Sequence, residues 1–483
     1  MEAAEESQRT EQRRWAGALL AVAVPLVAGL ALRFWMLKSL FEVNGDALIY
    51  GGIAKNLILH GRYDLTVSSG EMYPTLIRLP GYPLFIALCF KLFGMENYFS
   101  AAVVQIVMDL GSCLLLADFA RRIAPAANER GAWLATLWLA ALCPFTASYA
   151  VLPMPETPTI FALALAMDMM ARFRERHKWS TALCFTFAIT GATLLRPDGA
   201  LAGICFAPAL LIAVAKLSGE RGVPIAKLAR MAAVCVVLAV APFAVWAARN
   251  WSVFHVFQPL APRLANDPGE DPNLGWEHWV KSWCLDFIST YQIWWNVPWD
   301  KLDVNELPNR AFDSPAQYAE TVALAADYND HGMEITPEID ERFEKLAEAR
   351  IAAHPLRYYA WLPLGRVTDM WLRPRVENLP IDLDWWVYAH HHKETDFSWA
   401  YAGLNAAYLL LGLAGLLRRP RFWGALLAYM VLRSALLLTV EAPETRYTLE
   451  CFPMLFALGG VALSCAAQRS YLSKEKALAG SEG

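Results

Sequence analysis

The chain has 483 residues, of which 56% are hydrophobic and only 18% charged, and its apolar residues occur in blocks. This composition excludes an ordinary soluble protein and predicts an integral membrane protein in contact with the lipid bilayer. The net charge of -4 and the scattered basic residues argue against a nucleic-acid-binding protein.

Ten apolar runs are long enough to cross about 30 Å of hydrocarbon as helices. They are residues 15–37, 99–120, 131–150, 157–171, 179–195, 199–215, 231–248, 397–417, 422–440 and 447–467. The sequence therefore predicts an all-α polytopic fold with about ten membrane-spanning helices. Residues 82–93 are also apolar, but Pro83, Lys91 and a length of about a dozen residues predict a segment that lies along the membrane or dips into it.

The distribution of Lys and Arg predicts the orientation of these spans. Basic residues cluster in the loops on the same side as the N-terminus, whereas the opposite short loops carry only Arg196 and Arg446. Because cytoplasmic loops concentrate Lys and Arg, we expect ten spans with both termini in the cytoplasm.

The long polar stretch between the seventh and eighth spans predicts three regions. These are an N-terminal membrane module (1–249) that contains a first outer loop (41–98), an outer insertion (250–396), and a C-terminal membrane region with a tail (397–483). In the insertion, a capping box at 314–317 and Thr336-Pro337 predict two helices, the second ending at Pro355. Its tryptophans either stack on sugars or lie in the headgroup belt; they include Trp276, Trp279, Trp283, Trp294, Trp295, Trp299, Trp371, Trp385 and Trp386.

Asp46 is the candidate catalytic residue in the first outer loop. An acid at the outer end of a span lies at the water interface, where it can accept a proton from a hydroxyl group. The alternative is that Asp46 only caps a helix that follows Asn44-Gly45, because Asp and Asn both suit that position.

Further charged and aromatic residues fall at span ends on the same outer side. The candidates for the substrate cavity are Tyr50, Glu156, Arg196, Asp198, Glu444 and Tyr447, and the candidate cations are Arg78, Arg446 and Lys55. Snorkelling and loop solvation explain single charges at span ends, but not a set gathered on one side of the membrane.

Several short motifs resemble those of the GT-C glycosyltransferases, in particular aminoarabinose lipid A transferases and protein O-mannosyltransferases. They are Asp46-x-x-x-Tyr50-x-x-x-Ala54, Arg78-Leu79-Pro80-Gly81-Tyr82-Pro83-Leu84, Phe93-Gly94 and Arg446-Tyr447. The family commonly has a basic residue just before the proline of this loop, and here one residue is inserted between Arg78 and Pro80.

The resemblance implies an inverting glycosyltransferase with a GT-C bundle and a mainly helical periplasmic subdomain, located in a cell inner membrane. Its donor would be a sugar linked to polyprenyl phosphate, and its acceptor a hydroxyl group of a lipid, glycan or protein. Asp46 would be the base, and Arg78, Arg446 and Lys55 would bind the donor phosphate.

The sequence departs from the family in a way that bears on metal binding. Many members have two adjacent acids in the first loop, whereas Ala47 follows Asp46 here. A divalent cation is therefore optional, and the remaining candidate ligands are His390, His392 and Asp396, which also suit a polar interfacial patch.

A transporter or flippase of lipid-linked sugars is the alternative function. Transporters place ionisable residues near the middle of the bilayer and often contain repeated halves. Here the candidate acids lie at span ends and no repeat is visible, so the sequence favours the enzyme.

Overall fold

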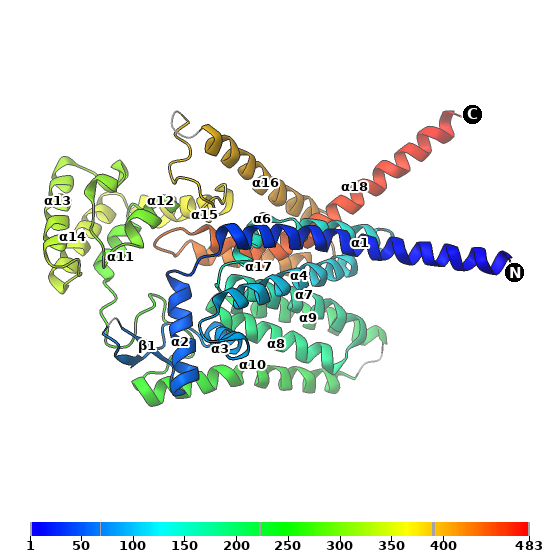
Figure 1. The fold of residues 1–483 in the computed structure, drawn as a ribbon, viewed down its shortest axis with the longest axis horizontal. Helices are drawn as coiled ribbons and strands as arrows, with labels where there is room; N and C mark the ends of the chain where they lie inside the picture. The colour runs from blue at the N-terminus through cyan, green and yellow to red at the C-terminus, as the bar shows by residue number, and fades with distance from the viewer. Residues whose placement is uncertain (1, 68, 222–223, 389–391, 482–483) are drawn as a thin grey trace. The chain divides into compact units, whose positions relative to one another are not determined.

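The computed structural model describes the chain except residues 1, 68, 222–223, 389–391 and 482–483 (Figure 1). The chain divides into two units. The first comprises residues 1–265, 407–429 and 449–483, and the second comprises residues 266–406 and 430–448. The described residues are mostly helical, with a single two-stranded sheet, which confirms the all-α fold class.

Each predicted span coincides with a helix or a bent pair of helices. The helices are α1 (Glu2–Leu40), α4 (Tyr98–Ile123), α7 (Glu156–Arg176), α8 (Trp179–Leu195), α9 (Ala200–Arg221), α10 (Ile225–Phe254), α16 (His392–Leu417), α17 (Trp423–Leu437) and α18 (Phe452–Ser481). The third run forms α5 (Glu129–Ala141) and α6 (Pro144–Ala150), which meet at an angle of 55°. Pro144 begins α6, and because proline lacks an N–H group it suits the start of a new helix.

The count of ten spans is not confirmed by helix length and composition. Among the described residues, six helices are long and apolar enough to cross a membrane, or seven if α5 and α6 count as one span. Helices α8 and α17 have only 17 and 15 residues, and the second half of α7 is rich in charge. The run at 82–93 forms α3 (Gly81–Phe93), whose 13 residues are also fewer than a crossing requires.

In the first unit, α4, α5, α7, α8 and α18 pack side by side (Figure 1). Helix α2 (Asp46–His60) packs on α3 through a cluster that includes Tyr50, Ala54 and Tyr82. Strands β1 (Asp64–Thr66) and β2 (Met72–Pro74) pair antiparallel after α2. The Asn56 amide of α2 donates to the Asp64 carbonyl at 2.9 Å and so holds this hairpin against the helix.

Arg33 and Asp109 form a buried ion pair between α1 and α4. Arg33 Nε donates to Asp109 Oδ2 at 2.6 Å, and Arg33 Nη1 donates to the Ala141 carbonyl at 2.7 Å. Ala141 is the last residue of α5, where the bend leaves helix carbonyls without partners in the helix. Arg33 therefore fixes both the α1–α4 contact and the bend from which the chain runs to Glu156.

The second unit contains α11 (Leu274–Lys281), α12 (Phe287–Ser289), α13 (Pro315–Asp330), α14 (Pro337–Ala353) and α15 (Leu362–Leu372), with short 3-10 and π-helical turns between them. Trp276, Trp279 and Trp283 are almost fully buried and pack with Phe343 of α14. Both expectations for these three tryptophans were therefore wrong: they contact neither lipid headgroups nor sugars, because they form the hydrophobic core of the unit. In contrast, Trp299 is 78% exposed.

The two helices predicted in the insertion are confirmed, together with their caps. Ser314 Oγ accepts from the Gln317 N–H at 3.2 Å at the start of α13, and Thr336 caps α14 in the same way. Helix α14 ends at Ala353, two residues before Pro355. A side-chain oxygen at the N-cap satisfies an N–H that has no partner inside the helix, so the signal is local and readable from sequence.

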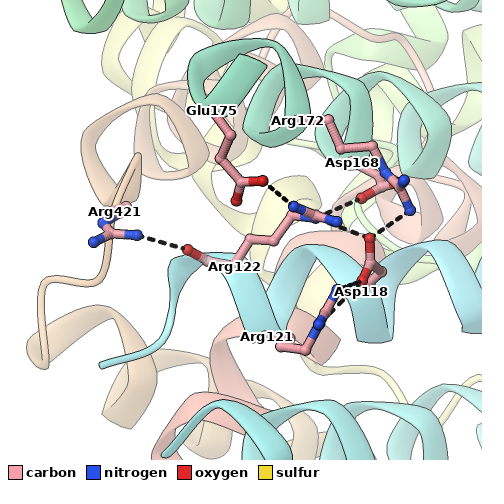
Figure 2. A network of polar contacts seen from close by, with 7 residues as sticks. All are labelled: Asp118, Arg121, Arg122, Asp168, Arg172, Glu175 and Arg421. Carbon is pink, nitrogen blue, oxygen red and sulfur yellow. Dashed lines mark hydrogen bonds and ion pairs between the residues drawn. The ribbon is translucent and has the colours of Figure 1, made fainter. Parts of the chain in front are cut away.

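A network of ion pairs joins α4 to α7 in the first unit (Figure 2). Asp118 accepts from Arg122 at 2.9 Å and from Arg172 at 2.5 Å, and Arg172 also donates to Asp168 at 2.7 Å. Further contacts involve Arg121, Glu175 and Arg421. These arginines belong to the loops predicted to be cytoplasmic, and in the structure they also join helices to one another.

Candidate functional site

Asp46 lies at the N-terminus of α2, next to Arg78. The chain enters the helix through Gly45, whose φ of 45° is one that glycine adopts without strain. Arg78 Nη2 donates to Asp46 Oδ1 at 2.6 Å, and the two side chains are 21% and 24% exposed. Gly45 rather than Asp46 occupies the N-cap position, although Asp46 still places its charge at the positive end of the helix dipole.

Two local contacts position Arg78. Its carbonyl accepts a hydrogen bond of 3.0 Å from the Tyr63 hydroxyl, and the flanking Leu76 and Leu79 are buried in a cluster with Trp246 of α10. The guanidinium lies 5.7 Å from the centre of the Tyr50 ring, within range of a cation–π attraction. The backbone on both sides of Arg78 is therefore anchored, while its side chain reaches Asp46.

Tyr50 is buried between this ion pair and the rest of the helix bundle. Its ring packs edge-on against Tyr82, and the ring centres are 4.8 Å apart. Burial raises the pKa of Tyr50 to about 12, and the charges of Asp46, Arg78, Glu156 and Arg196 also act on it. Tyr50 therefore stays protonated at physiological pH, and it is a hydrogen-bond donor there rather than a base.

A chain of hydrogen bonds connects α3 to the segment before α7. The Tyr82 hydroxyl donates to Gln105 Oε1 of α4 at 2.7 Å, and Gln105 Nε2 donates to the Leu152 carbonyl at 2.6 Å. The segment that starts at Leu152 leads directly into Glu156. Tyr82 and Gln105 thus connect the start of α3 to the segment that precedes α7.

Arg196 lies among three acids contributed by distant parts of the chain. It contacts Glu156 at 2.8 Å, Glu450 at 3.0 Å and Asp198 at 3.5 Å. Glu156 and Glu450 are fully buried, and a buried carboxylate is tolerated only with such partners. The structure therefore brings the predicted residues Glu156, Arg196 and Asp198 together.

The close approach of α3 to α8 brings this cluster towards the first loop. A side chain at Gly81, where α3 begins, would lie 2.5 Å from the Leu194 carbonyl, near the end of α8. Only glycine permits this packing, since no Cβ can approach a backbone oxygen so closely. Gly81 follows Arg78 by three residues, and Leu194 precedes Arg196 by two.

The structure does not bring Lys55 to the Asp46–Arg78 pair. Lys55 Nζ contacts Glu96 at 2.9 Å, and both side chains are about half exposed. Nine residues of helix separate Lys55 from Asp46, which corresponds to about 13 Å along α2. Lys55 therefore belongs to a surface ion pair.

Glu444, Arg446 and Tyr447 form a separate group within the second unit. Arg446 pairs with Glu444, and the Tyr447 hydroxyl donates to Glu444 Oε1 at 2.6 Å. The Arg446 guanidinium also lies 5.6 Å from the centre of the Tyr447 ring. These contacts fix the direction of the Arg446 side chain.

The candidate metal ligands do not form a cluster in the described part of the chain. His390 lies outside the described residues. His392 contacts the Tyr388 carbonyl, Asp396 is exposed, and no group of three or more His, Cys, Asp or Glu side chains among the described residues could hold a metal ion.

Sequence reasoning missed Glu450 and Gln105. Both lie within runs predicted to span the membrane, at 447–467 and 99–120. Ionisable residues within a span are costly unless they have partners, so a glutamate in such a run was a usable signal. The sequence did not indicate that the partner of Glu450 is Arg196, which lies more than 250 residues earlier in the chain.

Residues 77–246 match the family model described as dolichyl-phosphate-mannose-protein mannosyltransferase. The matched segment contains Arg78, Glu156, Arg196 and Asp198. Over this segment the chain is similar to protein mannosyltransferases, which agrees with the resemblance to protein O-mannosyltransferases drawn from the motifs. No curated protein matches the chain.

Two solved structures are similar to the chain at low identity. The oligosaccharyltransferase of Archaeoglobus fulgidus tethered with an acceptor peptide has a TM-score of 0.46 and 15% identity, over 95% of this chain and 50% of that one. ArnT from Cupriavidus metallidurans bound to undecaprenyl phosphate has a TM-score of 0.39 and 16% identity, over 93% of this chain and 77% of that one. The chain thus spans half the length of the oligosaccharyltransferase.

Proposed function

We propose that the protein is an inverting membrane glycosyltransferase that moves a sugar from a polyprenyl-phosphate donor to a hydroxyl group. The observation that carries this proposal is the partly exposed Asp46–Arg78 pair, a carboxylate and a guanidinium in direct contact. The matched family is named for a sugar carried on dolichyl phosphate, a lipid phosphate of the proposed class.

In the proposed reaction, the acceptor oxygen attacks the anomeric carbon of the donor sugar. A new carbon–oxygen bond forms there, while the bond from the anomeric carbon to the phosphate oxygen breaks on the opposite face. The acceptor proton passes to the Asp46 carboxylate, and the polyprenyl phosphate leaves with the electron pair of the broken bond. Asp46 supplies general-base catalysis, which is typically worth about 10² to 10⁴ in rate.

Arg78 has two partners in this reaction, and they compete. Without donor, its guanidinium is hydrogen-bonded to Asp46, and a paired carboxylate is a poorer base than a free one. A donor phosphate offers Arg78 a bidentate partner of higher charge. Binding of the donor would therefore draw Arg78 from Asp46 and raise the basicity of the carboxylate when the acceptor arrives.

Arg196 has a different role in the proposal. Because Glu156 and Glu450 already hold its guanidinium, Arg196 positions these acids instead of binding phosphate. Arg446 is the second candidate for the donor phosphate, since its side chain is fixed by Glu444 and Tyr447. We further propose that the site faces the outer side of a cell inner membrane.

Comparison of cells with and without the protein tests this function. Mass analysis of their lipids and glycans should find the glycosylated product only in cells that contain the protein. The same cells should contain less of the polyprenyl-phosphate-linked sugar donor. The purified protein should then transfer that sugar in a defined assay. Transport of the donor across vesicles without any glycosylated product would favour the flippase instead.

A further inference from the structure

One segment of the second unit exposes several large apolar side chains. Leu356, Tyr359, Trp361, Leu364 and Leu372 are each between 51% and 71% exposed. Leu356 precedes a π-helical turn (Arg357–Trp361), and the others lie on this turn and on α15, which follows it directly. Apolar side chains gathered in one patch to this extent mark an interaction surface.

The pattern along α15 shows that this is one continuous face. Trp361 at its N-cap and Leu364, Thr368 and Leu372 within it are exposed at helical spacing, and the intervening Leu362, Arg366 and Met370 are buried in the unit. The exposed stripe of this helix is therefore apolar, whereas its charged residues Arg366 and Asp369 lie off the stripe, with Arg366 fully buried and Asp369 paired with Arg373.

The one polar side chain on the stripe is satisfied within the helix. Thr368 Oγ1 donates to the Leu364 carbonyl at 2.8 Å. This bond removes the need for water at the hydroxyl, as in threonines of membrane helices. By contrast, the exposed face of α14 in the same unit carries charges that require water, namely Glu338, Glu341, Lys345 and Glu348.

Helix α15 packs against the apolar helix α17. The Trp371 indole N–H of α15 donates to Ser434 Oγ of α17 at 3.0 Å, and Arg366 donates to the Val440 carbonyl just beyond α17. On the same stretch of α17, Val431 and Leu436 are exposed apolar residues, as expected of a lipid-facing surface. The apolar face of α15 thus belongs to a helix that packs against α17, a short apolar helix of 15 residues.

We propose that residues 356–372 form an interfacial anchor that rests in the headgroup and upper acyl region of the membrane. Tyr359 and Trp361 have the amphipathic rings that favour this depth, and the leucines provide the apolar area. Arg357, the partly exposed arginine of this segment, is paired with Asp313 at 2.7 Å, so the anchor would recognise the apolar boundary of the bilayer rather than anionic headgroups. It would hold the outer unit at a fixed depth beside the membrane.

Site-specific photocrosslinking to lipid tests this assignment in the full-length protein. A benzophenone amino acid is placed at Tyr359, Trp361 or Leu364, and the protein is reconstituted in nanodiscs of phosphatidylethanolamine and phosphatidylglycerol. The matched control is Tyr318 of α13, an exposed tyrosine of the same unit, and the positive control is Val237 of α10, an exposed residue of a candidate span.

We expect lipid adducts at all three anchor positions, with yields on the order of tenfold above that of Tyr318 and near that of Val237, since interfacial burial keeps acyl chains in contact. Yields at the three positions no greater than at Tyr318 would overturn the anchor. Adducts with a second copy of the chain in place of lipid would also overturn it and assign the face to a protein interface. The positions are exposed, so substitution leaves the core intact, and the result does not depend on catalytic activity.

Discussion

Arg78 and Asp46 are joined by a hydrogen bond of 2.6 Å across a separation of 32 residues. The sequence predicts that Arg78 binds phosphate and that Asp46 accepts a proton. The contact shows that the two groups lie at one location. Both roles are therefore best tested together.

Replacing Asp46 with Asn separates base catalysis from a structural role. Asn has nearly the size of Asp, and its side-chain oxygen can still accept the hydrogen bond from Arg78, but it cannot take up the acceptor proton. We expect normal folding and donor binding, with a loss on the order of 10² or more in transfer rate. Steady-state kinetics of the purified variant, with thermal unfolding as the control for folding, would measure this. A wild-type rate in the Asn variant would remove Asp46 from the mechanism.

Replacing Arg78 or Arg446 with Lys tests the binding of the donor phosphate. Lysine keeps the charge but loses the planar guanidinium that makes two parallel hydrogen bonds. We expect a lower rate and weaker donor binding for each substitution, and a larger effect for Ala. Lys55→Ala is the control, because its surface pair with Glu96 should leave transfer unchanged. If both Arg→Ala variants retain full activity, neither arginine binds the donor.

Arg33 and Asp109 offer a test of what holds the first unit together. Arg33→Met or Asp109→Leu alone leaves a buried charge without its partner and should cost about 3–5 kcal/mol of unfolding free energy. The double variant should lose less unfolding free energy than the sum of the two single losses, because no unpaired charge remains. Unfolding in detergent measures these differences, and the exposed pair Lys55–Glu96 is the control, at about 0.2–1 kcal/mol. Additive effects of the Arg33 and Asp109 substitutions would mean that the pair contributes little.

Cysteine labelling tests the predicted orientation in the membrane. Glu348 on α14 and Arg418 after α16 are exposed, and the distribution of Lys and Arg places them on opposite sides. A membrane-impermeant maleimide should label Glu348→Cys in intact cells and Arg418→Cys only after permeabilisation, relative to the parent protein. Labelling of both positions from the same side would contradict the orientation.

The sequence alone determined where the helices lie and where several of them begin. In the apolar runs the reason is that a helix satisfies its backbone hydrogen bonds within the segment, so hydropathy is sufficient to locate it. The caps of α13 and α14 were equally readable, since Ser314 and Thr336 bond to residues three positions ahead. The short motifs around Asp46 and Arg78 also led to the family that residues 77–246 match.

The tertiary structure alone decided which side chains meet. Arg196 pairs with Glu450, and Trp276, Trp279 and Trp283 form a core instead of a surface, because these outcomes depend on how distant helices pack. From sequence, Lys55 and Arg78 were equivalent cations of one loop. In the structure Lys55, on α2, contacts Glu96, whereas Arg78, just before α3, contacts Asp46. Residue type and spacing define local hydrogen bonds, whereas the partner of a buried charge is selected by the packing that excludes water from it.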